Sequence, residues 1–179
     1  MVVVAAGQRG TTFTGTAVIL GSELDTRPVT RPFTLTVRGR TSGVETARYV
    51  RTLERVGQDA LQREIDSNEL GRFSLSGSVA QPLHAVIVHE SESETRIRAV
   101  FRWMEFGEWR RYKSDEHPFA YIEVRVDRRT GQGDGTIIPA ARIRFRPSRG
   151  GGPDTIQIEE YGTFPGQLMD VRMRGRRSF

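Results

Sequence analysis

The chain has 179 residues, the usual size of one domain, and its 36% of hydrophobic residues suits a sheet that buries only one face. It has no cysteine, which excludes disulfides and thiolate sites, and no apolar run of the roughly 20 residues that a membrane-spanning helix needs. Its three histidines lack the His-x-x-x-His spacing of a zinc site, and we expect no metal or other cofactor. The formal net charge of +5 is carried almost wholly by arginines scattered among 22 acidic residues, which indicates a solvated surface rather than specific nucleic-acid binding.

The first ten residues are expected to form an extension ahead of the domain. Residues 2 to 6 are small and apolar and lead into polar residues, as at the end of a secretory signal peptide, but a positively charged start is missing. Two interpretations stay open: a signal remnant, or a first strand with a frayed end. We expect one β-rich domain over residues 11–171, followed by a basic tail at 172–179. That tail fits either non-specific phosphate binding or a solvated terminus.

Two strand patterns open the domain. Thr12 to Leu20 is rich in β-branched residues, and residues 33–37 alternate between apolar and polar side chains, as a strand with one wet face requires. Pro28 and Pro32 each lack a backbone donor, so the second stretch is expected at a sheet edge or at a bulge.

One helical segment is predicted near residues 44–66. Ser42 and Glu45 have the spacing of a capping box, in which both side chains satisfy free N–H groups at a helix start. Gly57 is placed to stop or kink the helix. Apolar residues recur at every third or fourth position, and we expect this stripe to pack on the sheet and to serve stability: Val44, Ala47, Val50, Leu53, Val56, Ala60, Leu61 and Ile65.

The rest of the chain shows further strand patterns, which are Arg72 to Val79, His84 to His89, Thr95 to Trp103, Phe119 to Val126, Thr136 to Arg146 and Thr155 to Tyr161. So many strands with short links predict a mainly β (α+β) fold, an antiparallel meander that forms a barrel or a sandwich of about 8–10 strands. Residues 91–94 and 131–135 suit hairpin loops. The glycines of the second loop indicate a turn rather than a phosphate-binding loop, because a strand pattern and not a helix follows them.

Candidate functional residues gather between positions 103 and 123. The catalytic candidates are Glu105, Glu108, His117 and Glu123, which could serve general acid–base chemistry, and the ligand-binding candidates are Trp103, Trp109, Tyr112 and Tyr121. The pattern also fits charges that alternate along an exposed sheet face. Glu105 and Glu108 would point to opposite sides of a regular strand unless a bulge at Gly107 brings them together.

Several stretches together carry a resemblance to known proteins: Val50-Arg-Thr-Leu53, Gly57-Gln-Asp-Ala-Leu61, Trp103-Met-Glu-Phe-Gly-Glu108, Ser114-Asp-Glu-His-Pro-Phe119, Tyr121-Ile-Glu-Val124, Gly131-Gln-Gly-Asp-Gly135 and Ile156-Gln-Ile-Glu-Glu-Tyr-Gly162. They resemble a family of small proteins of unknown function that is common in Acidobacteria, over about Thr11 to Arg172. Members usually begin with a secretory signal peptide, so the resemblance implies an extracytoplasmic or secreted protein, with a cytoplasmic one as the alternative. The resemblance implies no activity and no catalytic residue.

Two functions follow as hypotheses. The first is a non-enzymatic extracytoplasmic β-domain that binds a small ligand or a protein partner, or that forms a homo-oligomer through exposed strand edges. The second is a small hydrolase or isomerase that uses the carboxylate and histidine cluster near residues 105–123, which would have to converge in one pocket.

Overall fold

The computed structural model describes residues 10–19, 28–102, 117–146, 155–160 and 165–175. Its strands are β1 (Thr11–Ile19), β2 (Val29–Val37), β3 (Gly71–Leu75), β4 (Gln81–Pro82), β5 (Ala85–Glu90), β6 (Glu94–Arg102), β7 (Phe119–Asp127), β8 (Gln132–Arg146), β9 (Thr155–Glu160) and β10 (Gly166–Arg174), and its helices are α1 (Gly43–Arg55) and α2 (Gln58–Ile65). The predicted fold class, mainly β with one helical region, is confirmed.

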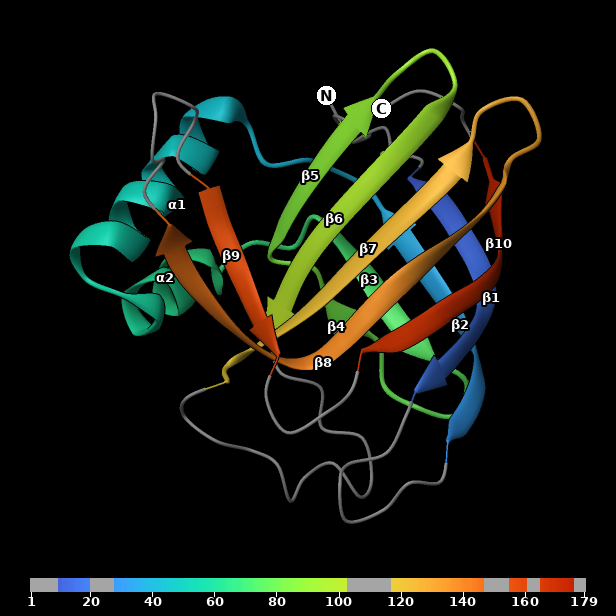
Figure 1. Cartoon of the computed structure of the whole chain (residues 1–179), viewed down its shortest axis with the longest axis horizontal. Coiled ribbons are helices and arrows are strands. Elements are labelled where there is room, and N and C mark those ends of the chain that lie inside the picture. The colour runs from blue at the N-terminus through green and yellow to red at the C-terminus, as the bar shows by residue number, and fades with distance from the viewer. Residues whose placement is uncertain (1–9, 20–27, 103–116, 147–154, 161–164, 176–179) are drawn as a thin grey trace, which may run out of the picture.

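The strands form one antiparallel sheet that curls into a half-barrel (Figure 1). Their order is β4-β3-β2-β1-β10-β8-β7-β6-β5, and β9 pairs with β8 outside this path. The pairing of β1 with β10 brings the first and last strands of the domain together, and it includes Thr12 opposite Arg174. Strand β10 runs to Arg174, so residues 172–174 of the predicted basic tail belong to the sheet.

The concave face of the half-barrel is filled with apolar side chains. Residues at alternate positions of the strands point inward, and the largest of them, such as Phe13 and Phe101, are fully buried. The ring of Phe73 on β3 lies 5.9 Å from that of Phe33 and 5.7 Å from that of Phe101, measured between centroids. Because β3 and β6 are not neighbours in the sheet, these rings pack across the interior and hold its two sides together.

The helices begin and break as predicted, but the buried face differs. Ser42 and Glu45 form the capping box, and Gly57, with φ of 105°, separates α1 from α2. The predicted apolar stripe is wrong at three positions. Val44 is 79% and Val56 71% exposed, and Ala47 is exposed as well.

The buried helical positions are Tyr49, Leu53, Leu61 and Ile65. Tyr49 and Leu53 are four residues apart, so they share one face of α1. Burying the ring of Tyr49 removes far more apolar area from water than burying Val44 or Val56, which fixes the rotation of the helix.

Polar contacts anchor the helices to the sheet. Arg102 at the end of β6 donates a hydrogen bond of 2.8 Å from Nε to Oδ1 of Asp66, which caps α2. Asn68 Nδ2 donates to Tyr49 Oη at 2.8 Å and to the carbonyl oxygen of His84 at 3.1 Å. These contacts fix the helices beside the strands that follow them.

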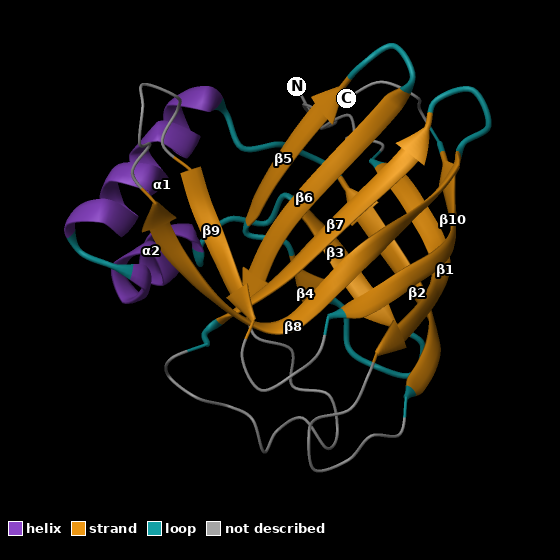
Figure 2. Ribbon diagram, viewed as in Figure 1, coloured by secondary structure: helices purple, strands orange, loops and turns teal. Residues whose placement is uncertain are grey.

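Strand β8 is long, and a bulge redirects its second half. In the β7–β8 register Tyr121 lies opposite Ile138 and Phe119 opposite Ala141, so β8 has one residue more than β7 between these pairs. Pro139 lies in the bulge, where its missing N–H costs no ladder bond. The bulge places Ile138 and Ala141 on the same face, and the second half of β8 leaves the half-barrel with β9 as an arm that extends toward the helices (Figure 2).

The hairpin predicted near residues 131–135 is present, but its turn lies earlier, between the end of β7 at Asp127 and the start of β8 at Gln132. Gly131, with φ of 71°, lies in the turn, where glycine adopts this conformation without strain. A Cβ on Gly133 would lie 1.8 Å from the carbonyl oxygen of Arg125, and one on Gly135 would lie 2.2 Å from that of Glu123. The two strand glycines therefore allow β8 to approach β7 closely.

A second apolar cluster lies on the outer face of the sheet, beneath the helices and the β8–β9 arm. Its buried members are Tyr49, Leu53, Leu61, Ile65, Phe119, Tyr121, Ile138, Ala141 and Ile143. The protein thus has two cores, one on each face of strands β6 to β8. Within the described ranges, neither helix is long and apolar enough to cross a membrane.

Candidate functional site

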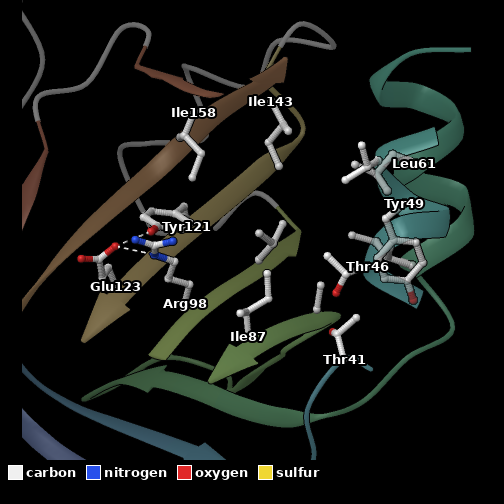
Figure 3. Close-up of a pocket in the computed structure, with 14 residues that line it drawn as sticks. Thr41, Thr46, Tyr49, Leu61, Ile87, Arg98, Tyr121, Glu123, Ile143 and Ile158 are labelled. Carbon is white, nitrogen blue, oxygen red and sulfur yellow. Dashed lines mark hydrogen bonds and ion pairs between the residues drawn. The ribbon is translucent and has the colours of Figure 1, made fainter. Parts of the chain in front are cut away.

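A cavity of about 570 Å³ opens within the second core, between the helices, the β8–β9 arm and the outer face of β5, β6 and β7 (Figure 3). Its lining comes from every one of these elements: Thr41, Thr46, Tyr49, Val50, Leu61, Ile65, Ala85, Ile87, Arg98, Val100, Tyr121, Glu123, Ile143 and Ile158. The half-barrel interior is packed with side chains, whereas the space beneath the helices is only partly filled.

Most of the wall is aliphatic. Strand alternation turns Ala85 and Ile87 of β5 and Val100 of β6 outward, because Val86 and Ala99 face the inner core. The helices add Val50, Leu61 and Ile65, and the arm adds Ile143 and Ile158. Such walls favour an apolar occupant, since apolar surface gains free energy when it leaves water.

One end of the cavity is polar. Glu123 accepts hydrogen bonds at Oε2 from Tyr121 Oη and from Arg98 Nε, both at 2.9 Å (Figure 3). Its Oε1 accepts from Arg125 Nε at 2.7 Å. Arg98 and Glu123 lie directly opposite each other in the β6–β7 register, and Arg125 follows two positions further along β7.

This arrangement fixes the charges at neutral pH. Burial works to raise the pKa of Glu123, but the hydrogen bonds from Arg125, Arg98 and Tyr121 outweigh it, and the pKa lies below its ordinary value. Burial, with the hydrogen bond to Glu123, raises the pKa of Tyr121 well above its ordinary value. The site therefore holds a carboxylate, a protonated phenol and two guanidinium groups.

The structure brings together only part of the predicted site. Tyr121 and Glu123 both line the cavity, whereas His117, which is half-buried just before β7, does not line it. The other candidates lie outside the described residues: Trp103, Glu105, Glu108, Trp109 and Tyr112.

Arg98 and Thr41 are lining residues that the sequence analysis did not select. Arg98 could have been selected from the sequence, because pairing its strand pattern with the next one along the chain places it opposite Glu123. No sequence pattern indicates Thr41, because the loop before α1 contacts β5 only in the folded chain. There Thr41 Oγ1 accepts a hydrogen bond of 2.9 Å from Val86 N.

Among the described residues, no group of three or more His, Asp or Glu side chains is arranged to hold a metal ion. No known protein family, curated protein or solved structure matches this chain. We therefore infer the function from the chemistry of the cavity.

Replacing Glu123 by glutamine is expected to destabilise the protein by about 1–2 kcal/mol at pH 7. The loss is no larger because Arg98 and Arg125 are about half-exposed, and solvent screens their attraction to Glu123. The folded-state pKa of Glu123 is lowered, so its contribution is present above the unfolded pKa of about 4.3 and is lost as pH falls through the lower folded-state pKa. Urea denaturation of both proteins between pH 7 and pH 3 should show the stability difference shrinking in acid. A difference that stays constant with pH would contradict the assignment.

Proposed function

We propose that the protein is a non-enzymatic binding domain for a small, mostly apolar molecule held beneath the helices. One observation carries the proposal: the cavity of about 570 Å³ has aliphatic walls and one polar end. Ligand pockets are typically about 300–1,000 Å³, apolar over most of their surface, with a few polar groups that orient the ligand.

The electrostatics of Glu123 support binding over the alternative of a hydrolase or isomerase. A general acid needs a carboxyl pKa raised toward neutrality, and a useful general base is poised near the working pH. The pKa of Glu123 is lowered instead, and its oxygens are already engaged by Arg98, Arg125 and Tyr121. This carboxylate is suited to hold neighbouring donors in place.

The strand edges favour ligand binding over self-assembly. The outward backbone groups of Val86 on β5 are occupied by Thr41, whose N–H donates to the Val86 carbonyl at 2.7 Å. At the other end of the sheet order, the edge strand β4 has only two residues. These two parts of the sheet edge offer little backbone for another chain to pair with.

Binding can be tested with 1-decanol as the probe and isothermal titration calorimetry as the measurement. Wild-type protein is expected to bind decanol, and Ala85→Phe, which fills the cavity from β5, should weaken binding by about tenfold or more. Ala47→Phe is the matched control, since Ala47 is exposed on α1 and does not line the cavity.

Ile87→Trp gives a second filling variant at a position that is already 43% exposed, so it can be used if Ala85→Phe fails to fold. Equal effects of Ala85→Phe and Ala47→Phe on decanol binding, or absence of binding of decanol and of its charged ten-carbon analogues to the wild type, would overturn the proposal.

A location outside the cytoplasm is the part of the proposal supported by sequence alone, through the apolar residues 2 to 6 and the family resemblance. Fractionation of cells that carry the native gene tests it, with the protein expected outside the cytoplasmic fraction. Recovery in the cytoplasm would remove this part and leave the binding proposal intact.

A further inference from the structure

The polar end of the cavity points to one class of ligand. We infer that the occupant is a single-chain amphiphile with an anionic head, such as the carboxylate of an aliphatic acid, and that Arg98 binds this head. The inference rests on the proposed binding function and specifies its chemistry.

Most polar groups around the cavity are already paired within the protein. Thr46 Oγ1 donates to the carbonyl oxygen of Ser42 at 2.9 Å, and Thr41 Oγ1 accepts from Val86 N. Tyr49 Oη accepts from Asn68, at 2.8 Å. Each of these hydroxyl groups can make a further hydrogen bond, but all three are neutral, so they bind a ligand more weakly than a charged donor does.

Arg98 is different, because its unused donors carry a positive charge. Its Nε donates to Glu123, and among the described residues its two Nη groups have no acceptor. The side chain is 48% exposed and lines the cavity, so these N–H groups are available to a ligand. Arg98 therefore supplies charged donors to the cavity, which an oxygen anion satisfies, and a carboxylate can do so with two parallel bonds.

The charged groups around Arg98 bear on the choice of head. Arg98 and Glu123 line the cavity as an ion pair, and Arg125, which contacts Glu123 from outside the lining, is also balanced by Glu94 and Asp134. Glu123 also holds Arg98 by Nε, which restricts the guanidinium before any ligand arrives. A neutral head would make a weaker hydrogen bond to the Nη groups of Arg98, and a cationic head would offer them no acceptor.

The shape of the site places the rest of the ligand. Figure 3 shows Arg98, Tyr121 and Glu123 together at one end, with Leu61 and Tyr49 of the helices at the other. An extended aliphatic chain that starts at Arg98 would run between the sheet and the β8–β9 arm toward the helices. Only its first atoms meet charged groups, which is the pattern of a molecule with one polar end.

The test compares three probes with the same ten-carbon chain: decanoate, 1-decanol and decyltrimethylammonium. Calorimetric titration of wild-type protein at pH 7.5 and low salt should show decanoate binding about tenfold or more tightly than decanol, since a charge-assisted hydrogen bond is lost with the neutral head. Added salt should weaken decanoate binding more than decanol binding. Decyltrimethylammonium should bind most weakly.

Arg98→Gln should lower the affinity for decanoate about tenfold more than the affinity for decanol. Arg96→Gln is the matched control: Arg96 lies on the same strand, is paired with Glu94 and does not line the cavity, so its removal tests for a general effect of charge. Equal binding of decanoate and decanol to the wild type, or tighter binding of the cationic probe, overturns the inference while the binding function stands. If none of the three probes binds, the proposed function itself fails and the inference falls with it.

Discussion

Replacing Phe101 by alanine is expected to lower the free energy of unfolding by about 3–5 kcal/mol, the largest effect that we predict for a single side chain. Phe101 is fully buried in the inner core, and its ring packs on Phe73 from across the half-barrel. Truncation removes the transfer energy of the ring and leaves a cavity that the hydrogen-bonded strands around it cannot close. Urea denaturation followed by far-ultraviolet circular dichroism measures the loss.

Val29→Ala is the control for this prediction. Val29 is also on a strand, but 38% of it is exposed, and its truncation should cost less than about 1 kcal/mol. Equal losses for Phe101→Ala and Val29→Ala would mean that the inner face of the sheet is not the main core.

Leu53→Ala is expected to cost about 2–5 kcal/mol, since Leu53 is only 6% exposed and lies in the second core beneath the helices. The cost should fall toward the lower end of that range, because the cavity nearby gives the surrounding side chains room to relax. The same denaturation experiment measures it.

Arg51→Ala is the matched control on the same helix, where the arginine is exposed, and it should change stability by no more than about 0.5 kcal/mol. Small and equal effects of Leu53→Ala and Arg51→Ala would show that α1 does not bury this face.

Features specified by neighbouring residues could be predicted from the sequence. The capping box of Ser42 and Glu45 depends on residues three apart, and the hairpin at residues 91–94 closes with a hydrogen bond of 2.9 Å from Ser91 N to Glu94 O. Strand alternation also identified most strands, because the inner face of the sheet is apolar at every second position.

Features that depend on the assembled fold could not be predicted in this way. The apolar residues of α1 fit more than one face, and the choice depends on what Tyr49 meets on the sheet. The bulge at Pro139 decides that Ile138 and Ala141 share a face, whereas regular alternation would separate them.

The cavity was beyond sequence reasoning for the same reason. Its lining runs from Thr41 to Ile158 and comes from loops, helices and strands that no local pattern connects. Tyr121 and Glu123 could be selected because they are a polar pair within one strand. Their partner Arg98 can be predicted only once the register between β6 and β7 is known.

The place of β10 between β1 and β8 has a consequence for biosynthesis. Strand β1 emerges first from the ribosome and β10 last, and until β10 is made β1 and β8 have no common neighbour in the sheet. In this order the described strands made before β10 fall into two groups, β1 to β4 and β5 to β9, each with an edge that β10 later covers. Strands that are far apart in the sequence pair slowly, and exposed strand edges are prone to aggregation until they are paired. The pairing that joins β1 to β8 through β10 therefore has to wait until β10 has been synthesised.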